Sequence, residues 1–89
     1  MRPVGRVGKD LAGGLLATPV YPNVTVNGFP IAVVTTKVAP HGGGPHAASV
    51  MVTGSPNVFV GAARHPVCSA ADLSSCGHPL VSTSNVTVN

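Results

Sequence analysis

A short alternating motif recurs three times in this chain of 89 residues. The pattern Asn-Val-x-Val begins at Asn23, Asn57 and Asn85, and its apolar and polar residues alternate with the period of a half-buried β-strand. The first copy runs directly into an Asn-Gly pair, which is a strong signal for a tight turn. A strand-turn-strand unit cannot bury its apolar face alone, so neighbouring units must cover one another. We therefore expect one domain that spans residues 1–89.

Each copy of the motif needs a second strand. Residues 30–34 follow the first copy, and the Gly-Ala-Ala-Arg segment 61–64 is assigned to the second copy. The third copy ends the chain, and its second element is expected at the other terminus, where residues 3–7 parallel residues 30–34. The sequence thus predicts three pseudo-symmetric β repeats cut open inside one turn, with the two termini close together.

Composition supports an all-β fold. Charged residues make up 8% of the chain, against about 25% in an average domain, and the chain has 11 Gly and 9 Pro. Disordered tails and helical bundles are richer in charge, and every apolar run is too interrupted to span a membrane. We expect a small body with Gly- and Pro-rich loops and no long helix.

A chain this small, with few large side chains to bury, needs added stabilisation from a disulfide, a bound metal or a partner. Four loop residues are the best metal ligands, and they form the patterns His-x4-His and Cys-x-His in the loops of two successive repeats. Imidazole and thiolate together suit Zn²⁺, which prefers four tetrahedral ligands in a structural site. The predicted ligands are His41, His46, Cys76 and His78.

Other arrangements of the same residue types remain open. The histidines could simply be solvated, and Cys68 or His65 could replace one of the four ligands. Cys68 and Cys76 could also form a disulfide, although we favour a packed, unoxidised Cys68. His65 precedes a proline beside the Gly-Ala-Ala-Arg segment, which favours a surface or packing role.

The distribution of charge limits the possible partners. The net charge is +3, but no basic stripe is interleaved with aromatic residues, so we expect no nucleic-acid partner. Residues 11–17 form an apolar run after several cations and superficially imitate a secretory signal. The run has only seven residues and contains two glycines, so we assign it to the fold and expect no signal peptide.

The sequence does not favour an enzyme. The His-Gly-Gly-Gly segment at 41–44 matches an esterase oxyanion loop, but no Gly-x-Ser-x-Gly nucleophile elbow accompanies it. Asp10 and Asp72 are the only acidic residues, and they lie far apart in the sequence, so no carboxylate pair is offered for acid-base chemistry. We expect no catalytic activity.

Several of these segments carry a family resemblance over essentially the whole chain. They are Pro-Val-Gly-Arg at 3–6, Pro-Ile-Ala-Val at 30–33, His-Gly-Gly at 41–43, Gly-Ser-Pro-Asn-Val-Phe-Val at 54–60, and Gly-Ala-Ala-Arg at 61–64. The sequence resembles the PAAR-repeat proteins, the pointed tips of type VI secretion spikes and contractile phage tail spikes. The family is named for a Pro-Ala-Ala-Arg motif, of which no unaltered copy occurs here, and the segment between Lys37 and Gly54 is unusually long.

The resemblance implies a cone-shaped body, a metal near its apex, and a base seated on a trimeric β-helical spike with one copy per trimer. The implied function is a metal-stapled tip that sharpens a membrane-piercing spike and touches the target envelope transiently. The protein would lie on a phage tail, or in the cytoplasm before export on a secretion spike. The alternative is a small metal-binding adaptor that loads effectors onto such a spike.

Overall fold

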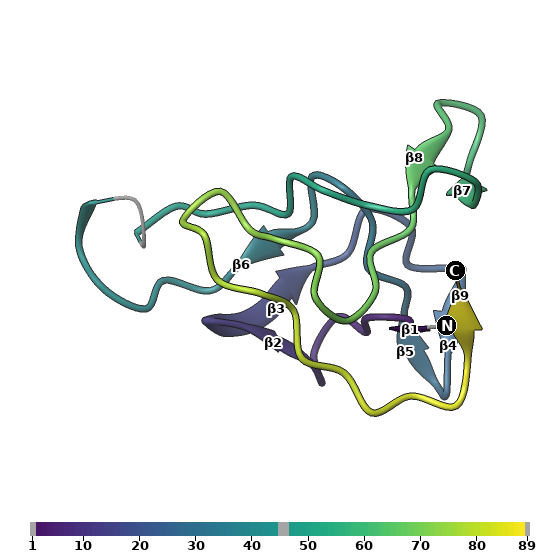
Figure 1. Ribbon diagram of the computed structural model, residues 1–89, viewed down its shortest axis with the longest axis horizontal. Coiled ribbons are helices and arrows are strands. Elements are labelled where there is room, and N and C mark those ends of the chain that lie inside the picture. Colours follow the sequence, from purple (N-terminus) through teal and green to yellow (C-terminus); the bar gives the residue numbers. More distant parts are fainter. Residues whose placement is uncertain (1, 45–46, 89) are drawn as a thin grey trace.

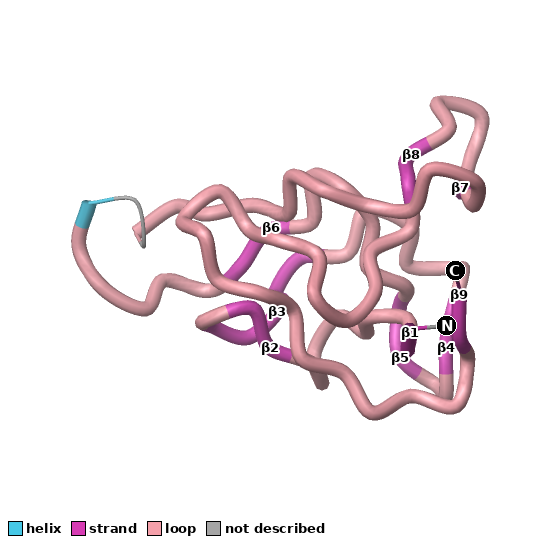
Figure 2. The backbone as a smooth tube through the Cα atoms, viewed as in Figure 1, coloured by secondary structure: helices cyan, strands magenta, loops and turns pink. Residues whose placement is uncertain are grey.

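The computed structural model describes residues 2–44 and 47–88 and confirms the all-β prediction. In this part of the chain, nine short strands are joined by long loops and there is no α-helix (Figure 1). The short cyan segment in Figure 2 is 3₁₀ structure at Gly44. No helix there is long and apolar enough to cross a membrane. The strands are β1 (Arg2–Pro3), β2 (Leu11–Ala12), β3 (Gly14–Thr18), β4 (Thr25–Val26), β5 (Phe29–Pro30), β6 (Lys37–Val38), β7 (Phe59–Val60), β8 (His65–Pro66) and β9 (Thr87–Val88).

Three two-stranded antiparallel ladders share one register. They are β4–β5, β7–β8 and β1–β9, and in each the third residue of an Asn-Val-x-Val copy faces a proline. These facing pairs are Thr25 with Pro30, Phe59 with Pro66, and Thr87 with Pro3. β1 pairs with β9, so the N-terminal and C-terminal segments lie side by side.

The assignment of residues 61–64 as a second strand is wrong. These residues form the turn between β7 and β8, in which the Arg64 N–H donates to the Gly61 carbonyl over 3.0 Å. Both residues have positive φ, 79° at Gly61 and 56° at Arg64. The chain must reverse before Pro66 can take the place that Pro30 has in β5. The second strand is therefore His65–Pro66, after a loop two residues longer than the Asn-Gly turn.

The segments that follow the three prolines close into a ring. The N–H of Gly5 donates to the carbonyl of Cys68, that of Cys68 to Ala32, and that of Ala32 to Gly5, over 2.9–3.0 Å. We call these three residues the central ring. Antiparallel bridges flank it and link the same segments in the same cyclic order: Val4 with Ser69, Arg6 with Ile31, and Val33 with Val67. Because three backbones meet here, only small residues fit. A Cβ on Gly5 would lie 3.1 Å from that of Ala32.

The two ends of the molecule differ. Figure 1 shows the three ladders at one end, which we call the ladder end, and β2, β3 and β6 extending from it. The β2–β3 turn and the loops that contain residues 39–44 and 75–78 project at the opposite end, which we call the loop end. The longest dimension, 32 Å, runs between these ends. Leu16, Met51 and Leu80 fill the interior between them, each at most 2% exposed.

A buried ion pair holds the first turn. The Arg6 side chain donates from Nε to Oδ2 of Asp10 over 2.8 Å and from Nη2 to Oδ1 over 2.9 Å. Asp10 also accepts the backbone N–H of Arg6 and the hydroxyl of Ser82. Both partners are nearly buried, at 6% and 5% exposure. The hydrogen bond to Asp10 and the attraction of its charge raise the pKa of Arg6 above its ordinary value.

Replacing Asp10 tests this pair. Removing one partner leaves a buried charge uncompensated, so Asp10→Ala is expected to lower the free energy of unfolding by about 3–5 kcal/mol. Lys9→Ala, at the exposed neighbouring position, is the control and should change it by less than about 0.5 kcal/mol. Guanidinium unfolding followed by circular dichroism measures both. Equal effects of the two variants would contradict the assignment.

Candidate metal centre

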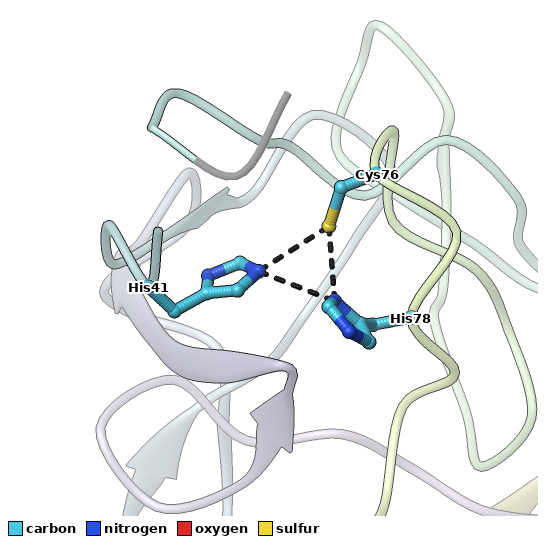
Figure 3. A group of neighbouring side chains, drawn as sticks. All are labelled: His41, Cys76 and His78. Carbon is cyan, nitrogen blue, oxygen red and sulfur yellow. Dashed lines mark hydrogen bonds between the residues drawn. The ribbon is translucent and has the colours of Figure 1, made fainter. Parts of the chain in front are cut away.

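Three ligand-type side chains converge at the loop end. His41 follows β6 after a short Ala-Pro connection, and Cys76 and His78 lie on the loop that leaves Ser74. Figure 3 shows the two rings and the thiol pointing toward one another. One ligand atom from each, Nε2 of His41, Sγ of Cys76 and Nδ1 of His78, lies within 4.8 Å of the others, and all three residues are half-buried. This His41–Cys76–His78 cluster could hold a metal ion.

The distances inside the cluster match a tetrahedral site. Nε2 of His41 lies 3.2 Å from Nδ1 of His78, and Sγ of Cys76 lies 3.4 Å from the former and 3.2 Å from the latter. With Zn–N lengths of about 2.0–2.1 Å and a Zn–S length of about 2.3 Å, tetrahedral ligands lie about 3.3 Å (N to N) and about 3.5 Å (N to S) apart. One ion at the centre would satisfy all three lone pairs together.

Neighbouring groups orient two of these ligands. The Nδ1–H of His41 donates to the carbonyl of Ala39 over 2.9 Å, which leaves the lone pair of Nε2 directed at the cluster. Metal-binding histidines commonly donate their other ring N–H to such a carbonyl. The hydroxyl of Ser74 contacts Sγ of Cys76 at 3.1 Å. The bond to Ala39, followed by that to Cys76, raises the pKa of His41 above its ordinary value.

Two glycines of the β2–β3 turn complete the site. A Cβ on Gly13 would lie 2.6 Å from Cγ of His78 and 2.9 Å from Nε2 of His41. A Cβ on Gly14 would lie 2.7 Å from Nδ1 of His41. Any side chain at these positions would occupy the space that the ligands use. The β2–β3 turn therefore leaves room for the ligands because it has no side chains there. The sequence did not reveal this role of the Gly-Gly pair.

The other predicted candidates lie elsewhere. His46 lies outside the described residues. Cys68 is buried in the core, its Sγ donates to the carbonyl of Thr53 over 3.2 Å, and burial raises its pKa to about 12. No disulfide joins it to Cys76, as expected for a packed cysteine. The ring of His65 pairs with the hydroxyl of Tyr21 over 2.7 Å at the ladder end, which is a packing role.

Comparison with known proteins adds no relatives. No protein-family model matches the chain, and no curated protein matches it either.

Metal content tests the cluster directly. We expect about one ion per chain in the native protein. Cys76→Ala and His78→Ala should each lose most of that ion and lower the melting temperature, because a structural zinc can contribute about 10–16 kcal/mol in small domains. His65→Ala is the control and should keep the metal. His46→Ala decides whether His46 is the fourth ligand. Native protein without a bound ion would refute the site, and metal retained without Cys76 but lost without Cys68 would move it.

Gly13 and Gly14, which we call the glycine cradle, give an independent test of the site. Gly13→Ala should lower metal affinity by about tenfold or more, the range seen when groups that position ligands are removed. Gly28→Ala is a matched control, because φ is +87° at Gly13 and +84° at Gly28 while nothing lies within 4 Å of a Cβ at Gly28. Both variants bear the strain of a left-handed alanine, so competition with a chromogenic chelator should separate them. Equal affinities would contradict the cradle.

Proposed function

We propose that this protein is a non-catalytic tip that caps a trimeric β-helical spike and is stapled at its apex by zinc. The loop end would point away from the spike and the ladder end would sit on it. The spike would be that of a phage tail or of a type VI secretion system, as the sequence resemblance implies. The tip would act mechanically, by giving the spike a narrow end that resists unfolding.

The observation that carries this proposal is the common register of the three ladders. β1–β9, β4–β5 and β7–β8 lie at one end, and each pairs the same motif position with a proline. A single chain with three similar faces can sit on a three-chain shaft without a symmetry mismatch. A chain with one unique face could match only one subunit of the trimer.

Exposed side chains at the ladder end support docking there. The first valine of each Asn-Val-x-Val copy is an exposed apolar residue: Val24 at 38%, Val58 at 37% and Val86 at 44%. Equivalent apolar contacts at three positions suit a partner with three equivalent subunits. The stability of such a complex depends on burying these side chains.

The donor set supports zinc as the metal. Imidazole nitrogen and thiolate sulfur are both zinc ligands, and His46 would supply the fourth ligand of a closed structural site. The ion would join loops that are distant in sequence. The ligands themselves are only half-buried and their loop neighbours are exposed, so burial in the core does little to fix these loops.

The carboxylates also support a structural role. Asp10 accepts the backbone N–H of Arg6 over 2.8 Å, and Asp72 accepts that of Ser69 over 2.7 Å. Both acids are 5% exposed and hold turns of the fold. A group engaged in this way is poorly placed for proton transfer to a substrate.

Mixing with a trimeric β-helical spike encoded beside this chain tests the proposal. Light scattering should give a complex with one copy of this chain per trimer. Val58→Asp combined with Val86→Asp should weaken the complex, because charges would be buried against the shaft. Val81→Asp is the control, since Val81 is 63% exposed and lies outside the ladders. Three copies per trimer, or no complex at micromolar concentration, would overturn the proposal.

A further inference from the structure

A band of outward-facing side chains lies between the two ends of the molecule. It consists of three cross-strand triads, each centred on the residue after Asp10, Thr36 or Asp72. We call this band the apolar belt. Its triads are Leu15-Leu11-Val81, Pro79-Leu73-Val52 and Val50-Lys37-Thr18.

The contacts within the belt follow from strand pairing. Leu11 pairs with Leu15 on one side and with Val81 on the other, and paired residues present their side chains on the same face. The second triad repeats this arrangement, since Leu73 pairs with Pro79 and its carbonyl accepts the N–H of Val52. Residues two apart in an extended chain also share a face, so Val81 and Pro79 join the two triads.

The belt is unusually exposed for aliphatic side chains. Among the described residues, nine large hydrophobic side chains are exposed, and five of them are in the belt. Those five are Leu11 at 49%, Leu15 at 40%, Val52 at 49%, Leu73 at 41% and Val81 at 63%. The other four belong to the ladder end. A contiguous apolar surface of this kind marks a place of contact with another phase or molecule.

The end beyond the belt has no ionic side chain. The segments 11–16, 38–52 and 73–81, which contain the loop end and all of the belt except Thr18 and Lys37, have no Asp, Glu, Lys or Arg. Their exposed residues beyond the belt include Gly42, Gly43, Ala47 and Ala48, which are small. Moving such a surface out of water incurs none of the cost of desolvating a formal charge. A zinc ion with one thiolate would add a single positive charge.

Every exposed ionic side chain in the described part of the chain is a cation. The two acids are buried, which leaves the exposed Lys9, Lys37 and Arg64 and the half-buried Arg2, whose guanidinium lies 3.9 Å from the Asp72 carboxylate. Two of these cations are associated with the belt. Lys37 lies within it, as the centre of the third triad, and Lys9 lies two residues before Leu11. The belt therefore combines aliphatic side chains with positive charge.

This combination suits a lipid interface better than a protein surface. Protein interfaces depend on Trp, Tyr and Arg anchors, whereas Leu and Val are under-represented among their hot spots. The belt has no aromatic residue, and its triads come from different parts of the chain. A fluid bilayer can follow such a surface. Apolar side chains bordered by Lys are the composition that binds anionic lipid surfaces.

We propose that the loop end enters the interface of an anionic bilayer as far as the apolar belt, with Lys9 and Lys37 at the level of the phosphates. The protein lies partly in the interface and does not span the bilayer. This binding needs no spike protein, so it goes beyond the proposed function and stands or falls separately from it.

Vesicle sedimentation of the purified chain tests the proposal. The protein should sediment with vesicles of mixed phosphatidylglycerol and phosphatidylcholine and much less with phosphatidylcholine alone. Leu11→Ser combined with Val81→Ser should lower the partition coefficient by about tenfold, since buried aliphatic area drives insertion. Lys9→Gln combined with Lys37→Gln should weaken binding and flatten its dependence on salt.

Two variants keep the test independent of folding and of the ladder end. Val86→Ser removes an exposed valine of the ladder end and should sediment like the native chain. Val81→Ser alone changes a side chain that is 63% exposed, so it should fold normally and still bind more weakly. Circular dichroism and the melting temperature check folding of each variant.

Three outcomes would overturn the proposal. They are no sedimentation with either vesicle, sedimentation that the Leu11→Ser and Val81→Ser changes leave unaltered, and a concentration-dependent dimer that these changes abolish while vesicles bind nothing. The last result would assign the belt to self-association. None of these outcomes affects the metal content or the complex with the spike.

Discussion

Three backbone hydrogen bonds in the central ring determine how the rest of the chain is arranged. Gly5, Ala32 and Cys68 each donate to one of the other two and accept from the third, so the ring closes without an open edge. Such close approach of three backbones tolerates only small side chains. The residues that follow the ring turn outward in the same way: the N–H of Arg6, Val33 and Ser69 each donate to a buried side-chain oxygen three or four residues later. Strand ladders lie on one side of the ring and loops on the other.

The loops diverge although the ring and the ladders do not. Each loop leaves from a buried polar residue, Asp10, Thr36 or Asp72, and each returns through one of the buried residues Leu16, Met51 and Leu80. Between these residues, the first loop contains the tight Gly-Gly turn. The second loop is the longest and contains His41. The third loop contains Cys76 and His78. The residues at the ends of each loop are constrained because they are buried. The residues at the tips are exposed or half-buried, so they can differ in chemistry. One site can therefore be built from unequal contributions of three similar positions.

The strand alternation of each Asn-Val-x-Val copy and the Asn-Gly pair at 27–28 are local signals, and they predicted the β4–β5 ladder. The sequence also predicted that the termini would pair and that His41, Cys76 and His78 would be candidates for one site. The second strand of the middle unit was misplaced, because Gly-Ala-Ala-Arg imitates a family motif while the true strand begins at His65. The third residue after each member of the central ring has a positive φ, and these residues are Gly8, Thr35 and Ala71. Thr and Ala rarely adopt this conformation, so the sequence gives no local signal for it at the last two positions. The role of Gly13 in making room for the ligands depends on contacts between loops, which no periodicity reveals.

The chain separates its ionic groups from its ligand-bearing end. Both acids are used inside the fold, where each caps a turn, and the exposed cations lie at the ladder end, in the apolar belt or next to it. Among the residues that the structure describes at the loop end, small side chains surround the cluster of two imidazoles and a thiol. An end of this composition gains little free energy from burial to hold its shape, since small residues bury little apolar area. A bound ion would supply that order and would add only one positive charge, held between half-buried ligands.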